Sequence, residues 1–205
     1  MSNVVEFSAI EDAAPEPAAP HRRLLLLSRG LAALLALILG LVALDMLAGI
    51  AFALFFGGHV LMSAHGLDIA FGRGGGLPRL QPGQVRLSDL PPITRLAGAA
   101  SWTVLGTPLL LVFHHLRRLF GLYARGVVFT PANAAHIARI GAWLIVYPFA
   151  NYACNTLFWL AGGADRAGWF HLEQVQAVVL GLIVLAIAQV MAFGHEIEQE
   201  KDSFI

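Results

Sequence analysis

Four long apolar runs, separated by more polar segments, dominate the pattern of the chain. They cover residues 31–56, 96–116, 140–160 and 172–193. Each run is close to or longer than the ~20 residues that a helix needs to cross a hydrocarbon core of about 30 Å. The pattern therefore predicts an all-α integral membrane protein, a four-helix bundle in which each apolar run is one span.

Composition agrees with a membrane bundle and excludes several other classes. Of the 205 residues, 58% are hydrophobic and 13% are charged, whereas soluble domains carry about 25% charged residues. The formal net charge is zero, which argues against direct nucleic-acid binding. The single cysteine, Cys154, lies inside the third run and excludes an internal disulfide and a Cys-based zinc site. We expect the lipid bilayer to be the main partner.

The segments around the runs suggest three regions. Residues 1–23 are polar and rich in Ala and Pro, which predicts a disordered tail. Residues 24–195 form the membrane domain, and residues 196–205 form an acidic tail. The first run is longer than the ~7–15 residues of a signal-peptide core, so we expect an uncleaved first span.

A Gly/Pro-rich outer loop, about residues 57–95, connects the first two spans. Residues 77–87 are nearly symmetric about Pro82-Gly83, and this pair suits the centre of a type II turn. A short irregular hairpin and a plain exposed loop are both consistent with this segment.

Basic residues favour an orientation with both termini in the cytoplasm. Eight Lys and Arg residues fall on the side of the termini and of the connection between spans two and three, and five fall on the other side. Because cytoplasmic loops carry the excess of basic residues, this distribution places the second connection inside the cell.

The connection between spans two and three contains signals that end one helix and begin another. Gly126 suits the residue just after a helix C-terminus. Thr130 suits an N-cap, and Pro131 suits the first helical position, where its missing N–H costs nothing. These signals predict a helix that starts near residue 131 and continues into span three.

This same stretch resembles a motif of the DUF2975 family, bacterial four-span membrane proteins of unknown function. The matching positions are Arg125, Gly126, Phe129, Thr130, Pro131, Asn133, Ile137, Ile140 and Gly141. Residues 196–205 also resemble the family's acidic end, although Lys201 replaces a usual Asn. The resemblance implies a cell inner membrane protein without catalytic residues, often encoded beside a helix-turn-helix regulator, which would be a cytoplasmic protein partner.

Polar residues inside the runs form a second candidate site. An acidic side chain within a span costs at least ~2.5 kcal/mol, so Asp45 invites a functional explanation. The spacing of the runs predicts that the other polar residues lie at a similar depth. Interhelical hydrogen bonding would be a structural explanation, which we favour, and an ion or polar-ligand site a functional one. The set comprises Asp45, Thr103, Thr107, Asn151, Asn155 and Gln176.

No motif indicates an enzyme, a cofactor or a metal site. The histidines fall near the ends of the runs and lack the spacing of haem or metal ligands. We therefore predict a non-enzymatic membrane regulatory or interaction protein. The alternative is a small transporter or channel subunit that uses the polar layer around Asp45. The sequence leaves open whether the protein forms a homo-oligomer.

Overall fold

Four long helices, each antiparallel to the next, form the body of the protein. The computed structural model describes residues 19–63, 66–128, 130–161 and 172–203, and among the helical residues the side chains of 19–24, 173 and 195–203 are not described. The four helices are α1 (Ala19–Phe55), α2 (Pro92–Tyr123), α3 (Pro131–Leu160) and α4 (Leu172–Ser203). The predicted all-α helical bundle is thus confirmed, and α4 continues as a helix through most of the predicted acidic tail.

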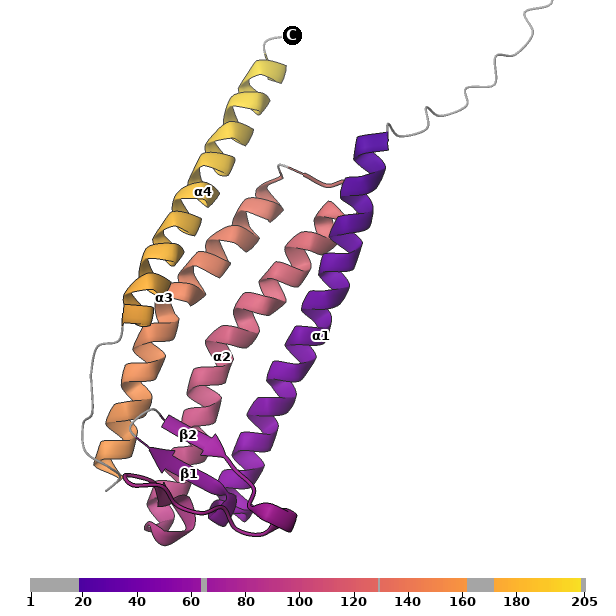
Figure 1. Ribbon diagram of the computed structural model, residues 1–205. Coiled ribbons are helices and arrows are strands. Elements are labelled where there is room, and N and C mark those ends of the chain that lie inside the picture. The colour runs from indigo at the N-terminus through magenta and orange to yellow at the C-terminus, as the bar shows by residue number, and fades with distance from the viewer. Residues whose placement is uncertain (1–18, 64–65, 129, 162–171, 204–205) are drawn as a thin grey trace, which may run out of the picture.

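The helices are arranged in the order of the chain. Helix α1 packs on α2, α2 on α3 and α3 on α4, and the extensive contacts between described residues are those between consecutive helices. Helices α1 and α4 therefore lie at the two edges of the bundle (Figure 1). The start of α1, the α2–α3 connection and the end of α4 share one end, which we call the junction end (Figure 1).

Three of the helical segments that the structure describes are long and apolar enough to cross a membrane. They are Leu25–Phe55, Pro92–Tyr123 and Gln174–Gly194. Helix α3 has the length of a span but is not one of these three, and Tyr147, Asn151 and Asn155 lie between its hydrophobic residues. Three long apolar helices indicate a membrane protein, and the crossing by α3 remains a prediction.

A small folded cap closes the opposite end, between α1 and α2 (Figure 1). It contains the strands β1 (Val60–Ser63), β2 (Gly66–Ile69) and β3 (Val85–Arg86), which form an antiparallel sheet in the order β2-β1-β3. Short 3-10 turns cover Gly57–His59, Arg73–Gly75 and Leu87–Asp89. Three fully buried side chains, Ala53, Val60 and Leu87, join the end of α1 to the sheet and to the turn before α2.

The predicted turn is present, but its strand pairs elsewhere. The Gln84 N–H donates to the Gln81 carbonyl over 3.0 Å, and Gly83 has φ +82°, as a type II turn requires. The strand β3 that follows the turn pairs with β1. Since β3 finds its partner some 25 residues earlier in the chain, residues 77–87 do not form a local hairpin. Residues 77–84 form an irregular, mostly exposed loop that leads into β3.

The cap is fastened to the helices by hydrogen bonds. The buried Thr94 hydroxyl at the start of α2 donates to the carbonyl of Ala161 just after α3, over 2.7 Å. The guanidinium groups of Arg86 and Arg95 each donate over 2.9 Å, to the carbonyls of Pro78 and Ser88 respectively. These contacts hold the starts and ends of the helices in register at this end.

Candidate functional site

The residues that resemble the family motif converge at the junction end, where α2 turns into α3. Gly126 has φ +75°; its N–H donates to the Tyr123 carbonyl over 3.0 Å, and the Val127 N–H donates to the Leu122 carbonyl over 3.1 Å. This pair of bonds defines a Schellman motif with glycine at the left-handed position. The predicted C-cap role of Gly126 is therefore confirmed, and Arg125 beside it is exposed.

Helix α3 begins at the predicted residue, but the predicted side-chain cap is not formed. Pro131 occupies the first helical position, and the backbone of Thr130 is extended, as at an N-cap. The Thr130 side chain makes no capping hydrogen bond; instead, its carbonyl accepts bonds from the N–H groups of Asn133 and Ala134. The start of α3 thus depends on backbone geometry and on Asn133.

Asn133 is the central polar residue of the junction. Its side chain is fully buried, and its Nδ2 donates to the Val127 carbonyl over 3.0 Å. The bond ties the connecting segment back onto the first turn of α3. The Oδ1 of Asn133 and the Oγ1 of Thr130 are buried without a partner among the described residues. The amide N–H of Asn133 reaches the Val127 carbonyl and holds the connecting segment. Ala has no such donor, and Ser has only a shorter hydroxyl group, which explains an Asn at this position.

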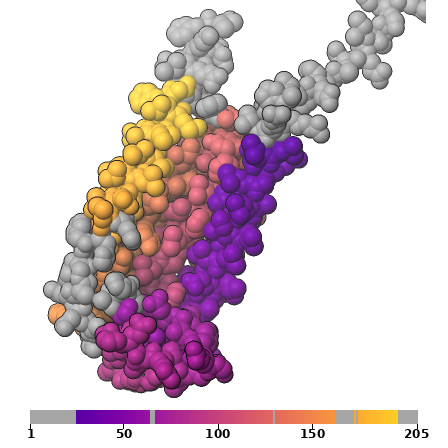
Figure 2. All heavy atoms as spheres, viewed as in Figure 1, coloured from indigo at the N-terminus to yellow at the C-terminus, as the bar shows by residue number. Residues whose placement is uncertain are grey.

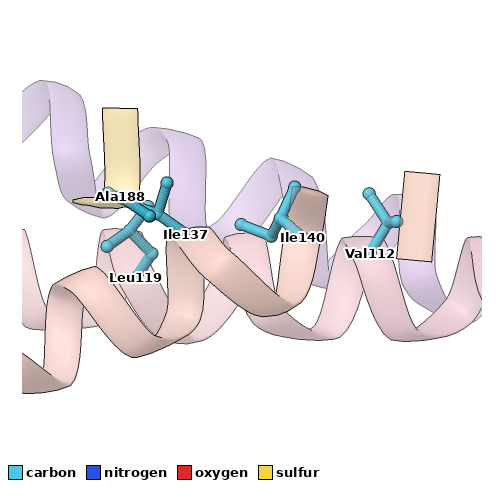
Figure 3. Packing of buried hydrophobic residues seen from close by; sticks show 5 residues of the cluster. All are labelled: Val112, Leu119, Ile137, Ile140 and Ala188. Atoms are coloured by element: carbon cyan, nitrogen blue, oxygen red, sulfur yellow. The ribbon is translucent and has the colours of Figure 1, made fainter. Parts of the chain in front are cut away.

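Beneath the connection, the motif isoleucines form the core that joins three helices. Ile137 and Ile140 of α3 pack with Val112 and Leu119 of α2 and with Ala188 of α4 (Figure 3). All five side chains are less than 10% exposed. This is the larger of the two buried apolar clusters in the described residues, so two positions of the motif lie in the main apolar core between the helices.

Gly141 allows α3 and α4 to approach closely. A Cβ atom placed on Gly141 would lie 2.8 Å from the Gly181 carbonyl oxygen of α4 and 2.9 Å from the Leu185 Cγ. Small residues at such crossings let helix backbones approach within a membrane. Of the remaining motif positions, Phe129 lies outside the described residues.

A histidine pair also joins α2 to α3 at this end. The Nδ1 atoms of His115 and His136 lie 3.2 Å apart, and the ring of His114 packs edge-on against His115. One ring must donate and the other accept, so the pair requires at least one unprotonated nitrogen. Burial, followed by the charges of Arg139 and Arg118, lowers the pKa of His136.

The pairing of these histidines was not predicted from the sequence. The signal for it is weak: each histidine lies five to eight residues from the helix end at the shared connection. In the described part of the chain, no three His, Cys, Asp or Glu side chains are placed to hold a metal ion.

The exposed surface of the junction is basic. Four arginines, two from the end of α2, one from the connection and one from α3, are exposed, and Val128 is 44% exposed among them. The arginines are Arg117, Arg118, Arg125 and Arg139. The junction thus presents exposed arginines and one exposed apolar side chain, Val128, next to a buried apolar core.

The second predicted site, the intramembrane polar set, is distributed differently. Asp45, Thr103, Thr107, Asn155 and Gln176 are exposed on the helices, and Asn151 is half-buried. The helix registers bring Asp45 and Thr107 to a similar depth, because Met46 contacts Gly106.

Among the described residues, the hydrogen bonds of these side chains all stay within one helix. Thr103 and Thr107 donate to the carbonyls four residues earlier, over 3.1 and 2.7 Å, and Asn155 donates to the Asn151 side chain over 3.4 Å. Whether the set has a function of its own remains a prediction.

Comparison with known proteins supports the resemblance to the DUF2975 family. The family described as "Protein of unknown function (DUF2975)" matches residues 91–205, which cover helices α2 to α4 and the connection between α2 and α3. Comparisons with curated proteins and with solved structures give no match. The match covers more than half of the chain, and the chain therefore belongs to the DUF2975 family.

Proposed function

We propose that this protein is a non-enzymatic regulatory or interaction protein of the bacterial inner membrane, with four spans and both termini in the cytoplasm. Its working surface would be the junction end, which would bind a cytoplasmic protein partner. One observation carries the proposal. The residues of the family motif lie partly in the buried core between α2, α3 and α4 and partly beside the exposed arginines of the junction.

The proposed orientation gains support from the cap. Two of its four arginines, Arg86 and Arg95, donate to backbone carbonyls within the cap, so their presence has a structural explanation. Within the part of the chain that the structure describes, Arg117, Arg118 and Arg139 show no such bond, whereas Arg125 donates to the Gly121 carbonyl over 3.3 Å. The excess of basic residues on this side favours a cytoplasmic junction.

The chemistry of the surface suggests the class of partner. Four exposed arginines attract an acidic protein surface, and Val128 offers a small apolar anchor. The resemblance to a family often encoded beside a helix-turn-helix regulator makes such a regulator the first protein to test. The arrangement of the polar set favours this role over transport, because its hydrogen bonds stay within single helices.

Site-specific photo-crosslinking in living cells tests the proposal. A photoreactive amino acid at Val128 should give a discrete protein adduct, and the yield should fall when Arg125 and Arg139 are both replaced by Glu. The matched control is Leu80 at the cap end, which is similarly exposed at 43% and should give no adduct with a cytoplasmic protein. Adducts at Val128 that consist of lipid alone would contradict the proposal.

A further inference from the structure

Helix α1 carries an uncovered stripe of leucines that ends in a carboxyl group. Because α1 packs mainly on α2 and lies at the edge of the bundle, much of its circumference is free (Figures 1 and 2). Leu27, Leu34 and Leu41 follow each other at intervals of seven, and Asp45 lies four residues further on. At 3.6 residues per turn, these four side chains lie along one face of the helix.

This face is separate from the contact with α2. Leu27, Leu34 and Leu41 are 70%, 50% and 56% exposed, and Asp45 is exposed as well. The contact with α2 lies on the neighbouring face, where Gly49 meets the Trp102 ring. In the part of the chain that the structure describes, Asp45 has no hydrogen-bond or ion-pair partner.

Such a carboxyl group needs a polar partner inside the membrane. The apolar segment of α1, Leu25–Phe55, has 31 residues, and a hydrocarbon core of about 30 Å centred on it would cover about 20 of them, Asp45 included. An acidic side chain in a span costs at least ~2.5 kcal/mol and faces protein or water rather than lipid. The exposed position of Asp45 therefore indicates that another helix covers the stripe.

We propose that the stripe of Leu27, Leu34, Leu41 and Asp45 is the interface of a parallel homodimer, in which α1 packs on α1 of a second copy. A spacing of seven residues is the pattern of left-handed helix pairs. A parallel pair brings the two Asp45 carboxyl groups to the same depth, where each is the polar neighbour of the other. A second copy thus supplies the polar group that Asp45 requires.

The charge on α1 permits this arrangement. Arg29 is exposed, but it lies roughly 120° around the helix from Leu41. Two copies that meet along the stripe therefore do not bring their Arg29 side chains face to face. This interface is independent of the partner proposed for the junction end.

Oxidative cysteine crosslinking of the full-length protein in its membrane tests the interface. In a Cys154→Ala background, Leu41→Cys should form a disulfide-linked dimer. The matched control is Leu47→Cys, which is 61% exposed but lies roughly 120° from Leu41 around the helix. We expect at least five-fold more dimer at position 41 than at position 47, and equal yields at the two positions would overturn the proposal.

The role of Asp45 is tested in the Leu41→Cys protein. Asp45→Leu should reduce the dimer yield several-fold, whereas Asp45→Asn should retain it, because an amide also donates and accepts. Gel filtration in mild detergent shows whether each variant remains folded. A yield unchanged by Asp45→Leu contradicts the polar contact, and equal loss with Asn and Leu would show that the carboxylate instead pairs with a basic helix of another protein.

Discussion

The Nδ1 atoms of His115 and His136 lie 3.2 Å apart and connect α2 to α3 directly beneath the α2–α3 connection. The pair lies in the half of the bundle that the family motif builds, and the positive charges of Arg118 and Arg139 act on it. A second proton on this pair would place two N–H groups against each other among these cations.

Stability at the junction should consequently depend on pH. The pKa of His136 is lowered from its ordinary value of 6.5, first by burial and then by Arg139, Arg118 and His114. The folded state therefore binds a proton less readily than the unfolded state, so stability is complete above about pH 6.5 and falls as the pH drops below it. We expect a lower Tm at pH 5 than at pH 7.5 in mild detergent.

The variant His136→Gln isolates this contribution. Glutamine can still hydrogen-bond to His115 but does not titrate, so the difference in Tm between pH 7.5 and pH 5 should shrink. Histidines at the cap end affect the wild type and the variant equally. Comparing the pH-dependent change in Tm of the two proteins therefore removes their effect. The same pH-dependent loss of Tm in the variant and in the wild type would show that the pair does not sense protons.

Asn133 should be the most sensitive polar residue of the junction. Asn133→Ala removes the donor to the Val127 carbonyl and leaves this partly buried carbonyl unpaired, which costs about 1–3 kcal/mol. Denaturant unfolding in detergent measures the free energy. The control is Ala132→Ser at the adjacent exposed position, where a change within about ±0.5 kcal/mol is expected. Equal values for the two variants would mean that Asn133 does not hold the connection.

Gly141 should tolerate no side chain. Gly141→Ala would press a methyl group against the Gly181 carbonyl and Leu185, and the resulting separation of α3 from α4 should cost about 1–3 kcal/mol. The matched control is Gly121→Ala in α2, where a Cβ atom meets nothing within 4 Å. That change should be neutral or stabilising, since glycine inside a helix costs about 0.5–1 kcal/mol. Thermal melts that rank the two variants the other way would contradict the close contact.

Local signals predicted the junction well. The C-cap at Gly126 and the helix start at Pro131 depend on residues next to each other in sequence, so the sequence contains all the necessary information. The turn at Pro82-Gly83 was predicted for the same reason. Thr130 is the exception, since its side chain does not cap the helix although its backbone has the expected conformation.

Features that depend on distant residues could not be predicted in this way. Strand β3 has only two residues and finds its partner in β1, far back in the chain. The His115–His136 pair and the contact of Gly141 with Gly181 require the register between helices, which hydropathy does not define. Hydropathy also does not define the face of the helix on which each member of the polar set lies.

The central claim is that the α2–α3 junction faces the cytoplasm, where a protein partner can reach it. Cysteine accessibility in spheroplasts tests it directly, with single cysteines at the exposed positions Gln81 of the cap and Ala132 of the junction in a Cys154→Ala background. A membrane-impermeant maleimide should label position 81 in intact spheroplasts and position 132 only after permeabilisation. Labelling of position 132 in intact spheroplasts, with protection of position 81, would contradict the account.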